Sequence, residues 1–382
     1  MAFGLYVHWP YCESKCPYCD FNSHVANHID ADRWVSAYQA EIRRVAASCP
    51  DEILDTIFIG GGTPSLMRPD VVAAVISSAR AAWRSRNDLE ITMEANPGSV
   101  EAARFAAYRE AGVNRVSLGI QSLDDAHLRL LGRKHGVSDA IKAIEIAQST
   151  FERVNIDLIY ARQHQTLAEW KSELDQALAL GTTHLSLYQL TIEDGTVFGR
   201  RHAEGKLPGL PDEDRSVDMF LYTQQRMEQA GRPAYEVSNH AAPGAECRHN
   251  LIYWQGGAYA GVGPGAHGRL GQGDLRRATE ALRDPADWLR HVEPGLVPEL
   301  PVAPLNATER VEEALIMGLR LTQGLPLERL RRDGAKTDPW PVKEQLIADG
   351  FLRQEADVLY ATTTGKLLLN TIVAELASGL DL

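Results

Sequence analysis

The sequence predicts an α/β protein in which a partial (β/α)6 barrel is followed by a smaller α+β extension and a C-terminal winged-helix-like domain. Within the first 190 residues, six short runs rich in β-branched and aromatic residues alternate with longer helical patterns. This alternation is typical of parallel βαβ units. From about residue 207 the alternation becomes less regular, and the last segment combines helical patterns with a small hairpin. We expect the three parts to span 1–200, 201–300 and 301–382.

The six predicted strands are short, apolar and bounded by turn residues. In a barrel of parallel strands, the residues that follow each strand meet at one end of the barrel, where active sites form. Polar residues at the ends of these strands are therefore candidate site residues. The strands are expected at residues 5–9, 56–61, 89–97, 115–122, 154–160 and 184–190.

Residues that start or stop helices lie between the strands. Asp30 precedes the first helical pattern, and Pro69 suits the first turn of the second. Thr166 and Glu169 form a capping box that opens a later helix. Ser99 is expected to cap the helix that stops at Gly112.

The second half contains one clear helical pattern at 212–231, a short β run at 234–237 and a glycine-rich stretch at 254–268. Residues 293–304 have the proline-rich composition of a linker. Beyond them, helical patterns surround a hairpin expected within 351–363. This combination predicts the winged-helix-like tail.

The charge and composition of the chain argue against some classes of function. The net charge of −12 argues against a general affinity for nucleic acid. No apolar run reaches the length of a membrane span, and the N-terminus lacks the order of a signal peptide. We therefore expect a cytoplasmic protein with reduced thiols, for which five cysteines do not indicate a disulfide framework.

Three of the cysteines, Cys12, Cys16 and Cys19, lie directly after the first predicted strand. A structural zinc ion would need a fourth ligand, such as His8, His24 or Asp20. A four-iron, four-sulfur cluster also has four corners, and thiolates are its usual protein ligands. Three cysteines would leave one iron open to a ligand that is not protein, and both alternatives stand at this point.

The spacing C-x3-C-x2-C, with the aromatic Tyr18 before the third cysteine, resembles the signature of the radical S-adenosyl-L-methionine (SAM) superfamily. The resemblance implies that Cys12, Cys16 and Cys19 hold a 4Fe-4S cluster and that SAM chelates the open iron. In such proteins the cofactors carry the difficult chemistry and the chain supplies placement. Cleavage of SAM is compatible with this interpretation but is not required by it.

Further positions resemble the SAM-binding residues of the coproporphyrinogen-dehydrogenase-like branch of that superfamily. Most of them follow predicted strands, and the polar ones suit ribose hydroxyls, an amino group or a carboxylate. The resemblance implies SAM contacts at Tyr6, Gly61, Gly62, Thr63, Glu94, Gln121, Arg133 and Asp157.

One segment departs from that branch. After Asp157 the family usually reads Gly-Leu-Pro-Gly-Gln-Thr, whereas residues 161–166 of this chain read Ala-Arg-Gln-His-Gln-Thr. The backbone of this loop, and with it the affinity for SAM, is therefore an open question.

The motifs "GGGTPS", "EANPGS", "RVSLGIQS", "LGRKH", "HNLIYW" and "GVGPGAH" are together similar to the HemW-type haem chaperones. The related dehydrogenases usually carry a fourth cysteine two places after the third, where this chain has Phe21. They also carry a long N-terminal extension, whereas eleven residues precede Cys12 here. Both features favour the chaperone branch over a true oxygen-independent coproporphyrinogen III dehydrogenase, which is the enzyme alternative.

The segment "HNLIYW" matches the motif by which the chaperone branch is thought to bind haem b. A neutral imidazole can ligate haem iron, and aromatic rings can cover a porphyrin. His249, Tyr253 and Trp254 are accordingly the haem-binding candidates, while Cys247 and Cys49 are expected to be incidental thiols.

The resemblance also implies partners. They are respiratory haemoproteins as haem acceptors, a bacterioferritin-type donor, a second copy of the chain in a homodimer, and transient membrane contact through a haemoprotein. A third hypothesis is an iron–sulfur redox or structural protein that binds no tetrapyrrole.

Overall fold

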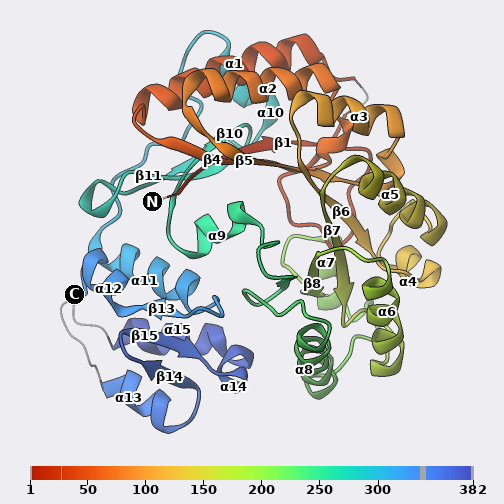
Figure 1. Ribbon diagram of the computed structural model, residues 1–382, viewed down its shortest axis with the longest axis vertical. Coiled ribbons are helices and arrows are strands. Elements are labelled where there is room, and N and C mark those ends of the chain that lie inside the picture. The colour runs from red at the N-terminus through yellow and green to blue at the C-terminus, as the bar shows by residue number, and fades with distance from the viewer. Residues whose placement is uncertain (1, 27, 336–340, 380–382) are drawn as a thin grey trace.

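The computed structural model describes residues 2–26, 28–335 and 341–379. A curved ten-stranded sheet forms its centre (Figure 1). The strand order is β12-β11-β10-β1-β4-β5-β6-β7-β8-β9, so the sheet is open and the predicted partial barrel is confirmed. The six predicted parallel strands are β1 (Phe3–Trp9), β4 (Ile53–Gly61), β5 (Arg84–Ala95), β6 (Arg115–Gln121), β7 (Arg153–Tyr160) and β8 (His184–Gln189).

Helices cover the convex side of this sheet (Figure 1). Asp30 caps the first of them through a hydrogen bond from the Arg33 amide, and Pro69 begins the second. The predicted capping box of Thr166 and Glu169 is present. These outer helices are α1 (Ala31–Ser48), α2 (Pro69–Ala82), α3 (Ala102–Ala111), α4 (Asp125–Leu130), α5 (Val137–Thr150), α6 (Leu167–Ala179) and α8 (Glu213–Gln229).

The predicted cap at Ser99 is wrong. Asn96 accepts a hydrogen bond from the Gly98 amide and so stabilises a separate short turn, Pro97–Ser99. Helix α3 begins only after Glu101, because this turn intervenes. Its end at Gly112 is as predicted, and that glycine has a φ of 113°.

The second half of the chain adds strands to both edges of the barrel sheet. Strand β10 (Ala258–Val262), from the glycine-rich stretch, pairs in parallel with β1. The β run predicted at 234–237 is wrong, since only Ala234 makes an isolated bridge there, to His240. The remaining elements of this part are α7 (Val197–Ala203), β9 (Asn239–Ala241), α9 (Arg248–Trp254), β11 (His267–Leu270), β12 (Arg277–Glu280) and α10 (Pro285–Val292).

The tail packs helices around a three-stranded antiparallel sheet, the arrangement expected of a winged-helix-like domain, and it has its own apolar core. The predicted hairpin is formed by β14 and β15. The elements are α11 (Ala307–Gly318), β13 (Leu325–Pro326), α12 (Leu327–Asp333), α13 (Pro341–Ala348), β14 (Leu352–Glu355), β15 (Val358–Ala361), α14 (Thr363–Leu367) and α15 (Leu369–Ser378).

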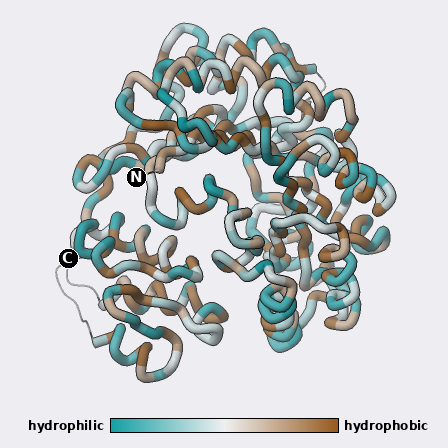
Figure 2. Tube along the Cα trace, viewed as in Figure 1, coloured by the Kyte–Doolittle hydropathy of each residue, from teal (hydrophilic) through white to brown (hydrophobic). Residues whose placement is uncertain are grey.

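The main core lies between the barrel sheet and its helices. Figure 2 shows apolar residues along the strands of the arc. Trp34 of α1 stacks on Trp288 of α10, with ring centroids 5.6 Å apart, and meets Trp9 edge-on. Buried aromatic pairs of this kind add to the stability gained by burying apolar area. They fix α1 beside the end of β1, from which the cysteine loop leaves the sheet.

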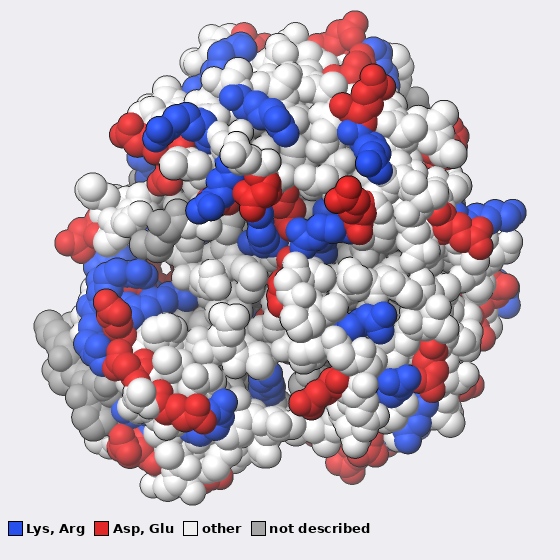
Figure 3. Space-filling view, in the orientation of Figure 1, with Lys and Arg blue, Asp and Glu red and all other residues white. Residues whose placement is uncertain are grey.

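On the face drawn in Figure 3, Lys and Arg side chains alternate with Asp and Glu. A mixed surface of this kind, on a chain with a net charge of −12, offers no broad cationic field on that face. Among the described residues, no helix combines the length and apolar character needed to span a membrane.

Candidate metal centre and cofactor site

The cysteine loop leaves β1 at the C-terminal end of the barrel. Its base is closed where β2 (Tyr11–Cys12) pairs with β3 (His24–Val25) and the His24 amide donates to the Pro10 carbonyl at 2.7 Å. The Cys19 amide donates to the Cys16 carbonyl at 3.1 Å, which makes a tight turn between these two cysteines. All three thiols of the loop are free and partly exposed.

Two hydrogen-bond donors from the barrel contact the cysteine loop, each at one sulfur atom. The Thr63 hydroxyl donates to Cys12 Sγ at 3.3 Å, and Arg133 Nη1 donates to Cys16 Sγ at 3.4 Å. Hydrogen bonds to sulfur stabilise cluster-bound thiolates and tune the cluster. Burial raises the pKa of the Cys12 and Cys19 thiols, so a metal must displace their protons on binding. The donor set therefore fits an iron–sulfur cluster.

The glycine segment after β4 is joined to the cysteine loop by its backbone. The Gly62 amide donates to the Trp9 carbonyl at 2.7 Å, and the Thr63 amide donates to the Tyr11 carbonyl at 2.8 Å. A Cβ on Gly62 would lie 2.6 Å from the Tyr11 carbonyl oxygen. Only glycine permits this approach.

We expect Gly62→Ala to push the cysteine loop away from the barrel. The free energy of unfolding should fall by about 1–3 kcal/mol, the usual cost of overpacking, and iron incorporation on reconstitution should fall with it. Urea unfolding and iron analysis measure the two effects. Gly98→Ala is the matched control, because a Cβ there would meet nothing nearer than 3.7 Å. Equal stability of the two variants would contradict this account of the contact.

Two carboxyl groups face the space above the sheet. Glu94, on β5, accepts a hydrogen bond from the Gly61 amide at 3.1 Å. Burial, and next to it the charge of Asp157, raise the pKa of Glu94 to about 8. Burial also raises the pKa of Asp157 on β7. The ionised form of each carboxyl group is favoured by a nearby positive charge, which SAM carries on its sulfonium.

Asp157 belongs to a polar layer that the sequence analysis missed. Asn155 Nδ2 donates to Ser117 Oγ and Asp157 Oδ1, both at 2.6 Å, and to Ser186 Oγ at 2.9 Å. Asn155 and Asp157 are two positions apart on one strand and so point to the same side. That spacing was the available signal, since polar residues recur at alternate positions of predicted core strands.

The predicted cofactor residues meet at one cavity of about 880 Å³ at the C-terminal end of the barrel. Tyr6 is the exception. It lines a second cavity of about 230 Å³, one layer deeper, and its hydroxyl lies 2.9 Å from His8 Nδ1. Glu94 and Asp157 border both cavities. The predicted residues around the larger cavity are Cys12, Cys16, Cys19, Gly61, Gly62, Thr63, Glu94, Gln121, Arg133 and Asp157.

Two of the three predicted haem residues, His249 and Tyr253, line the smaller cavity together with Tyr6, and Trp254 lines neither cavity. Helix α9 lies inside the arc of the sheet, at the N-terminal ends of the strands (Figure 1). His249 is fully buried, with Nδ1 2.6 Å from Thr56 Oγ1 and Nε2 2.6 Å from the Tyr253 hydroxyl. Burial lowers the pKa of His249 to about 3, so the imidazole is neutral. Both ring nitrogens already have partners inside the protein.

The other end of α9 touches the tail domain. Arg329 Nη1 donates to the Trp254 carbonyl at 2.8 Å, and the Arg320 guanidinium lies 5.8 Å from the Trp254 ring centroid. Cys247, which precedes α9, is buried, and burial raises its pKa to about 11. Helix α9 thus links the barrel sheet to the tail. Its residues His249 and Tyr253 do not line the cysteine cavity, but the smaller cavity that they line shares Glu94 and Asp157 with it.

The open barrel with a three-cysteine loop at its C-terminal end defines the class of protein. Residues 6–177 match the family model of the radical SAM superfamily, and residues 305–368 match that of the HemN C-terminal domain. A solved structure described as coproporphyrinogen III oxidase (HemN) from Escherichia coli superposes with a TM-score of 0.82, covering 99% of this chain and 90% of that chain at 21% identity. This similarity shows the fold.

The curated relatives specify the family. Heme chaperone HemW from Escherichia coli is 39% identical, over 97% of this chain and 97% of its own length. Radical S-adenosyl methionine domain-containing protein 1, mitochondrial, from Mus musculus is 37% identical, over 98% of this chain and 87% of its own. The chain belongs to the HemW family of radical SAM proteins. Membership of the superfamily implies a 4Fe-4S cluster and SAM, which the donor set described above accommodates.

Proposed function

We propose that this protein is a haem chaperone that binds haem b and delivers it to respiratory haemoproteins. The observation that carries the proposal is the end-to-end similarity to Heme chaperone HemW, at 39% identity over 97% of both chains. We further propose a bacterioferritin-type haem donor, a homodimer and a cytoplasmic location, with peripheral membrane contact only through a haemoprotein. The sequence boundaries of the three parts, 1–200, 201–300 and 301–382, remain proposals as well.

We assign the cluster to Cys12, Cys16 and Cys19, and SAM to the cavity beside them. When bound, the cluster supplies an open iron that the amino and carboxylate groups of SAM can chelate. The chain's own residues place the cofactors. Thr63 and Arg133 orient the sulfur atoms, while Glu94 and Asp157 offer carboxylates to the sulfonium of SAM.

The enzyme alternative is oxidative decarboxylation of coproporphyrinogen III. The fold of the HemN structure is compatible with it, but at 21% identity that similarity concerns the fold alone. The residue two places after Cys19 is Phe21, not the fourth cysteine of the dehydrogenases. We therefore favour the chaperone.

Anaerobic reconstitution followed by haem titration tests the proposed function. We expect a Soret band at one defined stoichiometry and transfer of that haem to an apo-haemoprotein, measured with and without SAM. Conversion of coproporphyrinogen III would favour the dehydrogenase. No Soret change at any haem concentration would favour an iron–sulfur protein without a tetrapyrrole.

His249, Tyr253 and Trp254 remain our proposal for haem contact, and the geometry adds a condition. His249 can ligate iron only if it exchanges its hydrogen bond to Thr56 or Tyr253 for the metal. Haem binding there would therefore require the side chains around the smaller cavity, of about 230 Å³, to rearrange.

We expect His249→Ala to lower the free energy of unfolding by about 2–4 kcal/mol, because it leaves a cavity and two buried hydroxyls without partners. The Soret band should also shift if the imidazole is the axial ligand. Tyr253→Phe is the matched control, since it removes one hydrogen bond and keeps both rings. Denaturant unfolding and haem spectra of both variants separate the roles. An unchanged Soret band in His249→Ala would contradict ligation by this residue.

A further inference from the structure

The loop after β7 is held in a conformation that its residues do not favour. Ala161 and His164 have φ values of 57° and 61°, in the left-handed region. Side chains other than glycine are strained there, and such strain persists only where neighbouring contacts fix the backbone. The two residues stand where the family pattern has glycine. The loop therefore keeps the backbone conformation of a glycine-containing loop, and contacts with neighbouring residues must stabilise that conformation.

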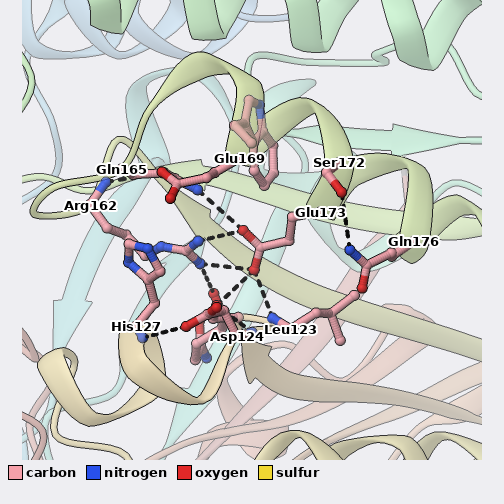
Figure 4. Close-up of polar contacts among 12 residues, drawn as sticks. Leu123, Asp124, His127, Arg162, Gln165, Glu169, Ser172, Glu173 and Gln176 are labelled. Carbon is pink, nitrogen blue, oxygen red and sulfur yellow. Dashed lines mark hydrogen bonds and ion pairs between the residues drawn. The ribbon is translucent and has the colours of Figure 1, made fainter.

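Arg162, which lies between these two residues, makes some of the contacts that stabilise the loop. Its side chain is 2% exposed and forms an ion pair with Glu173 of α6. Arg162 Nη1 donates to Glu173 Oε1 at 3.1 Å and to the Gln121 carbonyl at 3.2 Å, while Nη2 donates to Glu173 Oε2 (Figure 4). The planar guanidinium holds its donors in a fixed fork that matches these contacts, whereas an ammonium group is a compact charge without that geometry.

Glu173 joins this loop to the end of β6. Its carboxylate accepts from the Ser122 hydroxyl and the Leu123 amide, each at 2.7 Å, and from Gln165 Nε2 at 3.1 Å (Figure 4). One buried carboxylate thus receives donors from the segment after β6 and, through Arg162 and Gln165, from the loop after β7. The members of such a network are coupled to one another, although Arg162 Nε itself is buried without a hydrogen-bond partner.

The residue that all these contacts surround is Gln121. It ends β6 with a φ of 70°, again in the left-handed region, and it lines the large cavity. Arg162 holds its carbonyl, Glu173 holds the next two residues, and Arg133 Nη2 donates to the Gly119 carbonyl at 3.0 Å. The backbone on both sides of Gln121 is fixed, and with it the direction in which its Cα–Cβ bond leaves the strand.

We propose that Arg162 and Glu173 form a positioning pair that fixes the backbone of Gln121 so that its side chain is ready for bound SAM. The proposal rests on the SAM site assigned above and adds two residues to it that do not line the cavity. Buried ion pairs contribute little to stability compared with apolar residues of similar size. Stability alone therefore does not explain why this pair is present, whereas a role in orienting Gln121 does.

The test is a double-mutant cycle on SAM affinity. Arg162→Met, Gln121→Ala and the double variant are reconstituted anaerobically, and SAM Kd is measured by equilibrium dialysis at a temperature where each variant is folded. We expect each single variant to weaken SAM binding about tenfold and the double variant to be no weaker than either, because residues acting through one another are not additive. Asp175→Asn is the matched control, since it breaks an exposed ion pair between α6 and Arg226.

Arg162→Lys covers the case in which Arg162→Met does not fold. It keeps the charge opposite Glu173 but lacks the fork geometry that matches both Glu173 and the Gln121 carbonyl, so SAM affinity should fall in a folded protein. An unchanged Kd, or losses that add in the double variant, would overturn the proposal. A wild type that holds its cluster but binds no SAM would overturn the cofactor assignment as well, whereas haem titration of the same sample tests the chaperone function separately.

Discussion

Cys16→Ala is expected to abolish the iron–sulfur cluster and, with it, all measurable SAM binding. Three thiolates are the minimum protein ligand set for a cluster with one open corner, and two cannot hold it in place. The loss should be complete because SAM is anchored to the cluster. Iron and sulfide analysis after anaerobic reconstitution, with the visible spectrum, measures it. The same result is expected for Cys12→Ala and Cys19→Ala.

Cys49→Ala is the matched control for these variants. Cys49 is a free, partly exposed thiol at the end of α1, where its Sγ donates to the Val45 carbonyl. Removing it should leave about four irons per chain, the content of a complete cluster. Full iron content in Cys16→Ala would contradict our assignment of the ligands, and equal losses in both variants would indicate adventitious iron.

SAM affinity is expected to rise with pH up to about 8. The pKa of Glu94 is raised to about 8 by burial and by Asp157, so this group is protonated at neutral pH in the free protein. The sulfonium of SAM favours the ionised form of Glu94, so binding below pH 8 releases a proton. Proton linkage then makes the association constant increase up to about tenfold per pH unit below the pKa and level off above it. Equilibrium dialysis between pH 6 and 9 measures the slope.

Glu94→Gln removes the titrating group while it keeps the side-chain size. We expect a weaker affinity that varies less with pH, and the difference from the wild type cancels any titration of SAM itself. Glu193→Gln, which changes an exposed carboxylate on the rim of the same cavity, should keep the wild-type slope. Parallel pH profiles of wild type and Glu94→Gln would show that Glu94 does not bind a positive group of SAM.

The barrel could be predicted from the sequence because its signals are local. Each parallel strand is a short apolar run, and the helix starts at Asp30, Pro69 and Thr166 depend on contacts within one turn. The cap at Ser99 was mispredicted because the competing cap, Asn96, lies only three residues earlier. The spacing of Cys12, Cys16 and Cys19 was enough to predict the position of the candidate site.

Contacts between residues far apart in the chain could not be predicted from the sequence. Strand β10 joins β1 from about 250 residues away, and nothing local to Ala258–Val262 indicates that partner. The burial of His249 against Thr56 depends on the same return of the chain. The left-handed conformation of Gln121 was likewise not predictable, since glutamine does not prefer it and the contacts that impose it come from distant segments. For Ala161 the glycine of the family pattern was the available signal.

Electron paramagnetic resonance of the reduced, anaerobically reconstituted protein tests the central claim most directly, because it reports on the iron that the three cysteines leave open. We predict the signal of a single 4Fe-4S cluster whose g values shift when SAM is added. A cluster signal that is identical with and without SAM, or zinc in place of iron on the three cysteines, would contradict the account.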